Sequence, residues 1–272
     1  LTEWQRATEI DAQCVIHQPC QVDWALQHVV QGATIWLKLN AGMNRLGLSP
    51  TALLTAAAQL RAVGYQLILT MHYANADQPE HPLNAEQTAV FNTIAAQLAP
   101  IQSSLCNSAA LIAWPALHGD WVRPGIMLYG SSPFEQRSAA QLGLHAVMTV
   151  ESILMAQHDL AEGAAVGYGS RWTAQRPSRV GVVAIGYGDG YPRTAQGAVA
   201  RVAGQLVPVI GRVSMDMLLL DLTDLPLPIP NGTPVCLWGN SPSVDQVATS
   251  AGTLGYELLC RMTQRPTRQY SA

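Results

Sequence analysis

Polar side chains follow short apolar runs at several places in the first half of the sequence. Lysine and arginine bind carboxylate and phosphate groups, histidine transfers protons near neutral pH, and backbone N–H groups that open a helix can hold a phosphate. The candidates are Lys38 and Arg45 around a glycine-containing loop, His72 after Met71, Asn107-Ser108 before a helix-like run, and Arg123 ahead of Pro124-Gly125. Each has a structural alternative, because a lone histidine is more often a hydrogen-bonded structural residue and a serine can simply cap its helix.

The second half contains tyrosines set between glycines. Tyr168 stands in Val-Gly-Tyr-Gly at 166–169, and Tyr187 stands in Gly-Tyr-Gly-Asp-Gly-Tyr at 186–191. Glycine permits tight turns that would project such side chains outward, although tyrosine beside glycine is also common in hairpins that only pack. A further segment, 211–217, places Met215 at the start of a strand-like run. Spacing alone does not identify an enzyme here.

The first half alternates strand-like and helix-like segments, which predicts parallel strands joined by crossover helices. The expected strands are 13–17, 34–39, 66–71, 101–105 and 122–128, and the expected helices are 22–31, 51–63, 84–98 and 108–114. Ser49 followed by Pro50 predicts the start of the second helix, and Asn84 with Gln87 resembles a capping box for the third. In this arrangement the polar candidates lie where strands end, as they do in (β/α)₈ barrels.

Five strands cannot close a barrel that needs eight. An open barrel would leave its apolar interior and one strand edge exposed. The alternatives are therefore an open sheet, or about three βα units upstream of Leu1.

After about Ala146 the pattern changes to short β-branched runs separated by Gly and Pro, which predicts an all-β domain. The expected strands are 148–155, 180–185, 198–202, 207–210, 217–220 and 234–237, with helices at 244–251 and 256–261. The predicted fold class is α/β: part of a (β/α)₈ barrel at 1–140, followed by a β-strand-rich domain at 141–272.

Composition excludes several classes of protein. Hydrophobic residues make up 49% and charged residues 12% of the 272 residues, and the net charge of −3 includes no run of like charges. These values argue against nucleic acid or an anionic membrane as the main partner, and no apolar stretch approaches the ~20 residues of a membrane span. The five cysteines lack CxxC spacing, which favours reduced, buried thiols in a cytoplasmic protein.

Taken together and in order, these segments resemble the alanine racemase family. The loop Gly42-Met43-Asn44-Arg45-Leu46-Gly47 is similar to the family's Asp-Thr-Gly-Met-x-Arg signature, and the segment Asp120-Trp121-Val122-Arg123-Pro124-Gly125-Ile126 is a particularly specific match. The resemblance runs from about Ala33 to Tyr270. It implies an isomerase that interconverts L- and D-alanine, a source of D-alanine for peptidoglycan precursors, with an N-terminal eight-stranded barrel and a C-terminal β domain.

The resemblance also implies catalytic roles. Tyr168 would be the base on the L-alanine side, and a lysine that carries the cofactor would serve the D side. A phenol has a pKa of about 10, so Tyr168 needs positive charge nearby, for which His72 and Arg123 are the matching residues. Arg123 would donate a hydrogen bond to the pyridine nitrogen of pyridoxal 5'-phosphate and, because arginine keeps its proton, leave that nitrogen unprotonated.

The remaining matching positions would bind cofactor or substrate. Cofactor binding is implied for Asn107, Ser108, Gly125 and Ile126, and substrate binding for Arg45, Met215 and the entry residue Tyr187. Lys38 matches a lysine that many members carry as a carbamate, which braces the neighbouring arginine. In the family Tyr168 and Met215 act in the partner subunit's site, which implies a homodimer with shared active sites. No metal ion is implied.

The sequence lacks one family segment and departs from the family's pattern at three further places, one of which is the mild change to Tyr73 where Phe is common. The cofactor lysine segment, similar to Lys-Ala-Asn-Ala-Tyr-Gly, has no match. We therefore expect this segment to lie upstream of Leu1, and the 272-residue chain alone to bind pyridoxal phosphate poorly and not to racemise alanine. Asn40-Ala41 replaces the usual Asp-Thr, which predicts different hydrogen bonding in that loop, and Gln264 stands where some members have a phosphate-binding tyrosine.

Two other functions remain open. A broad-specificity amino-acid racemase would have a wider entry around Tyr187 and would also exchange lysine or arginine enantiomers. A non-catalytic remnant of a racemase, kept for binding or dimerisation, would have no upstream coding sequence with the cofactor lysine.

Overall fold

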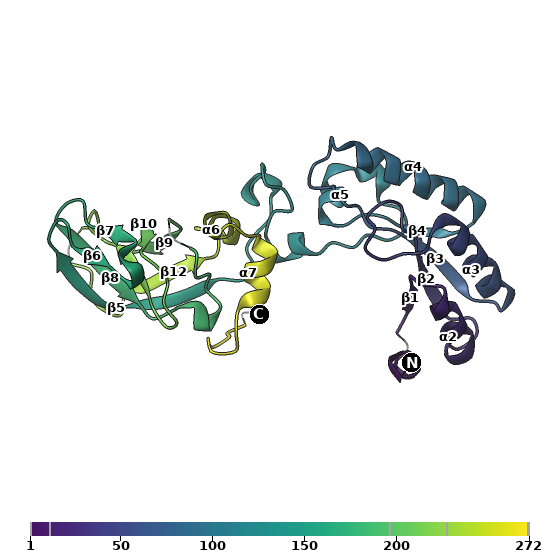
Figure 1. Cartoon of the computed structure of the whole chain (residues 1–272), viewed down its shortest axis with the longest axis horizontal. Coiled ribbons are helices and arrows are strands. Elements are labelled where there is room, and N and C mark those ends of the chain that lie inside the picture. Colours follow the sequence, from purple (N-terminus) through teal and green to yellow (C-terminus); the bar gives the residue numbers. More distant parts are fainter. Residues whose placement is uncertain (1, 11, 196, 227, 271–272) are drawn as a thin grey trace. The chain divides into compact units, whose positions relative to one another are not determined.

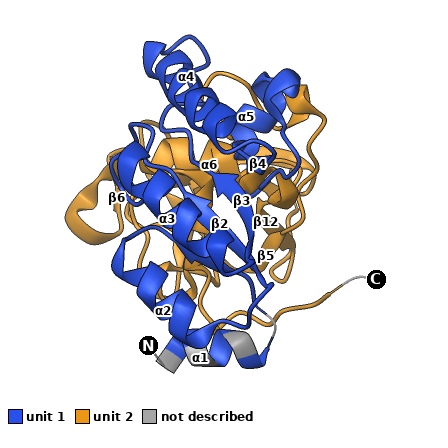
Figure 2. Ribbon diagram, turned by 90° about the vertical axis from the view of Figure 1, so that its right-hand side faces the viewer, with its two compact units in different colours: residues 1–125 blue, residues 126–272 orange. Residues whose placement is uncertain are grey.

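The computed structural model describes residues 2–10, 12–195, 197–226 and 228–270. The chain divides into two compact units, residues 1–125 and 126–272 (Figure 2). The division between the units follows Gly125, and the sequence-based boundary at 140/141 stays a prediction.

The first unit is a parallel sheet with crossover helices, as the alternating pattern predicted (Figure 1). Its strands pair in chain order: β1 (Cys14–Ile16), β2 (Thr34–Lys38), β3 (Gln66–Thr70) and β4 (Gln102–Ser104). Its helices are α1 (Thr2–Glu9), α2 (Cys20–His28), α3 (Pro50–Ala62), α4 (Pro82–Gln97) and α5 (Ser108–Ala113), with a 3₁₀ turn η1 (Pro115–Leu117). Lys38, Thr70 and Ser104 stand at the same level at the carboxyl ends of three strands.

The fifth strand predicted for this half, 122–128, is wrong. Residues 121–125 have no regular structure, and the 3₁₀ turn η2 (Ile126–Tyr129) follows them. Pro124 cannot donate to a strand ladder, and the N–H of Arg123 donates instead to the carbonyl of Cys106, at 3.0 Å. The segment is therefore hydrogen-bonded to residues 103–106 at a few points without forming a strand.

Helix starts were predicted correctly at α3 and incorrectly at α4. The Ser49 hydroxyl accepts a hydrogen bond from the N–H of Ala52, as expected. Helix α4 is capped by His81 instead of Asn84, because Pro82 occupies its first position. Asn84 and Gln87 are buried on the inner face of the helix, where they bind loop backbone.

The second unit contains a closed antiparallel barrel with the strand order β10-β11-β8-β5-β12-β9. These strands are β5 (Val150–Leu160), β8 (Ser178–Val183), β9 (Val199–Val202), β10 (Gln205–Ile210), β11 (Leu218–Asp221) and β12 (Pro234–Trp238). A hairpin of β6 (Ala165–Val166) and β7 (Trp172–Thr173), the helices α6 (Val244–Ala251) and α7 (Gly255–Arg261), and short 3₁₀ turns complete the unit. The six predicted strands and two predicted helices are confirmed, with boundaries shifted by a few residues.

The barrel core explains why this half reads so clearly as β structure. Leu154, Leu220, Val235 and Trp238 are fully buried, and Tyr191 stacks on the Trp238 ring with 5.8 Å between centroids. Along β9 and β11 buried side chains alternate with half-buried ones, and such alternation is the signal that identifies strands in a sequence.

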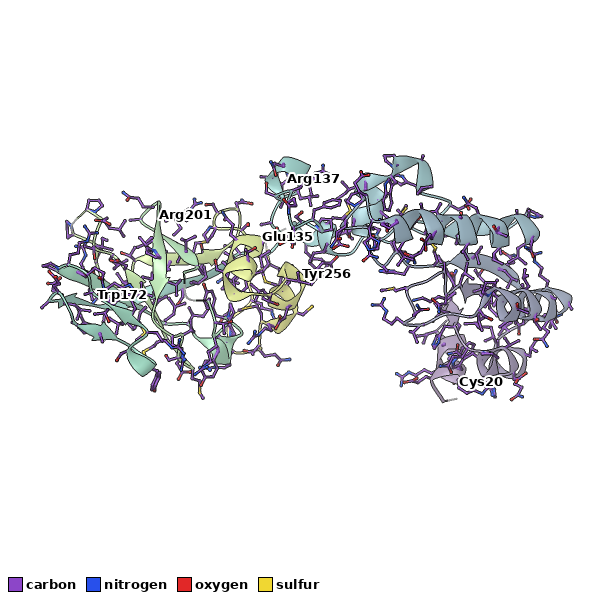
Figure 3. The ribbon with its side chains drawn as sticks, turned by 45° about the horizontal axis from the view of Figure 1, so that its top comes forward. Cys20, Glu135, Arg137, Trp172, Arg201 and Tyr256 are labelled. Atoms are coloured by element: carbon purple, nitrogen blue, oxygen red, sulfur yellow. The ribbon has the colours of Figure 1, made fainter. Side chains whose placement is uncertain are left out.

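All five cysteines are free thiols, but their expected burial is confirmed only in part. Cys106 is buried, while Cys20 (Figure 3) and Cys260 are exposed. Cys20 begins α2, whose buried residues are Val22 and Ala25, so the thiol falls outside the packed face. Among the described residues, no helix combines the length and apolar character that a bilayer crossing requires.

Candidate active site

Cationic side chains gather at the carboxyl ends of β2, β3 and β4 in the first unit. Lys38 ends β2, Arg45 lies in the loop that follows it, and the Arg123 guanidinium reaches the backbone beyond β3 and β4. The groups that perturb the pKa of Lys38 and of His72 include these cations and no carboxylate. This end of the sheet is therefore suited to an anion.

Arg123 is held by backbone oxygens from two loops. One terminal nitrogen donates to the carbonyl and the hydroxyl of Ser104, and the other donates to the carbonyls of Met71 (2.5 Å) and Leu105 (3.5 Å). Its Nε–H makes no hydrogen bond with the described residues, so one donor remains for an external acceptor. The four oxygens that accept from the terminal nitrogens fix the direction of the Nε–H. A sequence motif does not reveal this orientation.

The loop after β3 is fixed by a buried glutamine that the sequence analysis had assigned to a helix cap. Gln87 accepts from the N–H of Ala74 and donates to the carbonyl of His72, both at 3.0 Å. The His72 Nε2 lies 3.5 Å from the Asn107 side-chain nitrogen. Asn107 also accepts from the N–H of Ala110 and so caps α5. His72 and Asn107, predicted as separate candidates, are thus brought together.

The surroundings of His72 oppose its protonation. Burial, and after it the charges of Arg123, Arg45 and Lys38, together lower the pKa of the imidazole to about 4. The ring is therefore neutral near pH 7. Of the two residues matched to the positive charge beside the phenol, Arg123 carries the charge in this unit, and the role of His72 towards the phenol stays a prediction.

We expect an NMR titration of the His72 imidazole to give a pKa of about 4. The unfolded chain takes up this proton near pH 6.5, whereas the folded protein resists it until about pH 4. The contribution of His72 to the free energy of unfolding is therefore constant above pH 6.5 and decreases as the pH falls towards 4. A titration midpoint near 6.5 in the folded protein would contradict this electrostatic description.

In the loop that carries Arg45, the side chain of Asn40, which stands in the Asn40-Ala41 pair that replaces the usual Asp-Thr, makes hydrogen bonds to the loop. The side-chain oxygen of Asn40 accepts from the N–H of Gly42 (3.2 Å) and of Asn44 (3.0 Å). Asn44 and Gly47 have positive φ values of 57° and 135°, and a Cβ on Gly47 would lie 2.6 Å from the Asn40 nitrogen. An amide oxygen thus accepts both loop N–H groups here.

Ser108 and Gly125 meet at the start of α5. The Gly125 N–H donates to the Ser108 hydroxyl at 2.8 Å, and a Cβ on Gly125 would come within 4 Å of that hydroxyl only, at 3.9 Å. The backbone here is open to a ligand oxygen, and the Gly125 N–H could donate to a phosphate if that phosphate took the place of the Ser108 hydroxyl. In the second unit, Ile126 begins η2, and its N–H makes no hydrogen bond with the described residues.

Tyr168 lies on a tight turn of the second unit. Gly167, Gly169 and Ser170 all have positive φ, and the tyrosine is 70% exposed. This agrees with the prediction that flanking glycines project the ring outward. The Tyr168 hydroxyl makes no hydrogen bond with the described residues, so nothing in this unit occupies it.

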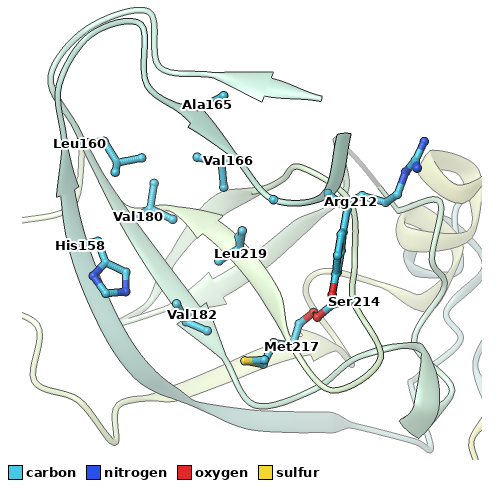
Figure 4. A pocket seen from close by; sticks show the side chains of 12 residues that line it. His158, Leu160, Ala165, Val166, Val180, Val182, Arg212, Ser214, Met217 and Leu219 are labelled. Atoms are coloured by element: carbon cyan, nitrogen blue, oxygen red, sulfur yellow. The ribbon is translucent and has the colours of Figure 1, made fainter. Parts of the chain in front are cut away.

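An apolar hollow of about 600 Å³ lies beside this turn. Figure 4 shows side chains of β5, β8 and β11 and of the hairpin around it, among them Leu160, Val166, Val180 and Leu219, while the Arg212 side chain points away. Trp172 (Figure 3), on β7, packs against the same small cluster. The hairpin with Tyr168 is therefore only partly packed against the barrel.

Tyr187 and Met215 lie on two loops joined backbone to backbone. The N–H of Tyr187 donates to the carbonyl of Ser214 (3.0 Å), and that of Gly188 to the carbonyl of Met215 (2.8 Å). A Cβ on Gly186 would lie 2.3 Å from the Met215 oxygen, so this close approach requires glycine. The Met215 N–H has no partner among the described residues and is available to a carboxylate.

Comparison with known proteins assigns the chain to a family. Residues 1–133 match the family model described as alanine racemase, N-terminal domain, and residues 147–270 match alanine racemase, C-terminal domain. An alanine racemase from Psychrobacter sp. (strain PRwf-1) is 52% identical over 288 residues, which cover 98% of this chain and 77% of that protein. The chain belongs to the alanine racemase family.

Solved structures of alanine racemases share the fold. The biosynthetic alanine racemase from Pseudomonas aeruginosa is 46% identical with a TM-score of 0.95, over 100% of this chain and 76% of that chain. An alanine racemase from Bartonella henselae, described with covalently bound pyridoxal phosphate, is 26% identical with a TM-score of 0.86, over 98% of this chain and 75% of that chain. These matches confirm the predicted fold class and the assignment to a racemase, an isomerase.

Sequence reasoning missed residues that position the alanine racemase candidates. Gln87 was assigned to a cap, and Ser104 and Arg265 were not singled out. Both Gln87 and Ser104 are fully buried. The available signal for Gln87 was a polar residue on the apolar face of a helix, and for Ser104 a hydroxyl at the end of a strand.

Proposed function

We propose that the enzyme to which this chain belongs interconverts L- and D-alanine with pyridoxal phosphate, with Tyr168 as one base and, as the other, a cofactor-bound lysine that the 272-residue sequence does not contain. The observation that carries the proposal is the Arg123 guanidinium, which four oxygens hold while its Nε–H has no acceptor among the described residues. A donor that cannot lose its proton is suited to an unprotonated ring nitrogen. Bound pyridoxal phosphate supplies an electron sink for the substrate α-carbon.

The polar groups of the first unit fit the cofactor. The Ser108 hydroxyl and the Gly125 N–H would donate to phosphate oxygens, because the backbone beside Gly125 is open. Ile126 would add its free N–H. Asn107 would hold His72 and the start of α5 in place. The uncompensated positive charge at this end of the sheet favours the dianionic phosphate.

The second unit would supply the acid–base group and substrate contacts. Tyr168 takes the α-proton of L-alanine when L-alanine is the substrate. It gives a proton to the α-carbon when D-alanine is converted to L-alanine. Its hydroxyl has no hydrogen-bond partner among the described residues, and we propose that it faces the Arg123 end of the partner subunit's site. Arg45 and the Met215 N–H bind the substrate carboxylate, and Tyr187 restricts entry.

We propose that the enzyme is a homodimer in which Tyr168 and Met215 of one subunit complete the other subunit's site. The exposure of Tyr168, at 70%, and of Met215, at 53%, supports this arrangement. We further propose that the enzyme acts in the cytoplasm, where it would supply D-alanine for peptidoglycan precursors.

We expect Lys38 to be carbamylated. Burial and the charges of Arg45 and Arg123 lower the pKa of its ammonium, so more of the nucleophilic neutral amine is present than for an exposed lysine. The resulting carbamate would be an anion between those two arginines. Lys38 is the only lysine in the sequence, so ¹³C NMR of protein equilibrated with ¹³C-bicarbonate has little background.

A carbamate resonance that disappears in Lys38→Arg is the expected result. The negative charge should also raise the pKa of His72 above about 4, because one of the cations that lower it is replaced by an anion. Equal spectra of the two proteins would show that Lys38 forms no carbamate.

The proposed function is tested by the approach of each alanine enantiomer to an equal mixture, followed by circular dichroism in the presence of pyridoxal phosphate. Parallel assays with lysine and arginine address the broad-specificity alternative. Racemisation of alanine alone supports the proposal, and equal rates with the larger amino acids would replace it by the broader activity. Cofactor binding without any racemisation by the intact enzyme would favour the non-catalytic alternative.

A further inference from the structure

We infer that Arg265 is a positioning residue that joins the two loops carrying Tyr187 and Met215 and thereby sets the affinity for the substrate carboxylate. This inference rests on the proposed function. It adds a residue from the C-terminal segment that lies outside every motif of the sequence analysis.

The Arg265 guanidinium bridges one carboxylate from each loop. Its Nε lies 3.3 Å from Asp189 Oδ1, and a terminal nitrogen lies 2.6 Å from Asp216 Oδ1. Asp189 is largely buried, with 13% of its side chain exposed, and its other oxygen accepts from the N–H of Gly186 at 2.9 Å. One side chain therefore connects the start of the first loop with the residue after Met215.

The C-terminal segment that carries Arg265 is itself attached to the first loop. The N–H of Thr263 donates to the carbonyl of Asp189, and its hydroxyl donates to the carbonyl of Gly188, both at 3.1 Å. The same hydroxyl accepts from the N–H of Arg265 at 3.3 Å. A Cβ on Gly188 would lie 2.1 Å from a terminal nitrogen of Arg265. The guanidinium is thus placed against the loop backbone before it reaches Asp216.

The second loop depends on this contact more than the first. Asp216 makes no other ion pair or hydrogen bond with the described residues, and Met215 is 53% exposed. Without Arg265, Asp216 would be free and the 214–217 loop would be held only by its backbone bonds to Tyr187 and Gly188 and by the bonds of Ser214 to Met217. Loss of the bridge should therefore loosen the Met215 N–H.

The effect should appear in substrate binding and hardly in stability. Exposed ion pairs contribute little to the free energy of unfolding, and half of the Arg265 side chain is exposed. A donor that must be oriented towards a carboxylate loses affinity when its loop becomes mobile. We expect Arg265→Gln to raise KM for alanine about tenfold, the size of one charge-assisted hydrogen bond, and to change kcat less than about threefold.

The test compares Arg265→Gln with a matched control. Arg176 donates to both oxygens of Asp224 at 2.6 Å in an exposed pair of the same unit, and Arg176→Gln should keep the wild-type KM. Arg265→Lys should give an intermediate KM, because an ammonium lacks the planar fork that bridges two carboxylates. Equal KM values for Arg265→Gln and Arg176→Gln would overturn the inference.

A second measurement is independent of activity. Hydrogen-exchange mass spectrometry of the intact protein should show faster exchange in peptides covering 186–191 and 213–217 for Arg265→Gln, and no change there for Arg176→Gln. Unchanged exchange in 213–217 would overturn the positioning role even if KM rises. If the intact enzyme, which also carries the cofactor lysine, fails to racemise alanine, the proposed function fails, whereas the exchange experiment still decides whether Arg265 joins the loops.

A milder variant guards against misfolding. Asp216→Asn removes one arm of the bridge and leaves Arg265 paired with Asp189. It should accelerate exchange in 213–217 alone and raise KM by less than Arg265→Gln. A global increase in exchange for both variants would show that the bridge is needed for folding of the unit and would overturn a specific role at the site.

Discussion

Replacing Arg123 by glutamine should lower kcat for alanine racemisation by about 10²- to 10³-fold, the usual loss when one oriented donor to a developing charge is removed. Glutamine is shorter and neutral, so it can neither reach the carbonyls of Met71 and Leu105 nor present the Nε donor. The unpaired backbone oxygens should also reduce the free energy of unfolding by about 1–3 kcal/mol. Steady-state kinetics and urea unfolding measure the two effects.

The same variant should raise the pKa of His72 above about 4, because Arg123 is the strongest of the charges that lower it. Arg61→Gln is the matched control, since Arg61 also donates to backbone carbonyls of this unit, those of Leu98 and Pro100, away from the cationic group. It should leave kcat and the His72 titration unchanged. A cofactor-loaded Arg123→Gln enzyme with kcat within about threefold of wild type would contradict the role proposed for the guanidinium.

Tyr168→Phe should lower kcat by about 10²- to 10⁴-fold, the contribution of a positioned proton-transfer group. Its effect on stability should be close to zero, because the ring is 70% exposed and its hydroxyl has no partner among the described residues. In deuterated solvent the variant should lose exchange of the L-alanine α-proton and keep that of D-alanine, since only the L-side base is removed. NMR of each enantiomer measures the exchange.

Tyr270, 88% exposed, provides the control: Tyr270→Phe should exchange both enantiomers at wild-type rates. Mixing Tyr168→Phe with Arg123→Gln protein tests the shared site, because hybrid dimers would contain one site with neither substitution and should regain activity. Equal loss of exchange for both enantiomers, or no recovery in the mixture, would show that Tyr168 does not act as a one-sided base in a partner's site.

The sequence predicted the elements that depend on interactions between residues close together in the chain, and it failed where contacts between distant segments decide the structure. The six barrel strands of the second unit could be predicted because alternation along each strand reports burial within that strand. The segment 122–128 could not, because its apolar residues resemble a strand while Pro124 and the bond from Arg123 to Cys106 prevent pairing. Likewise, Asn84 and Gln87 have the spacing of a cap, but they bind loops that precede the helix.

For the site, the sequence by itself determined the residue types, their order and the family, because motifs such as Trp-Val-Arg-Pro-Gly are local. Only the tertiary structure decided which groups meet: the carbonyls around Arg123, the neutral state of His72 at pH 7, and the bridge from Arg265 to Asp216, 49 residues apart. The physical reason is that desolvation, charge and hydrogen-bond geometry depend on neighbours in space. Neighbours brought together by strand ends and loops leave no periodic signal along the chain.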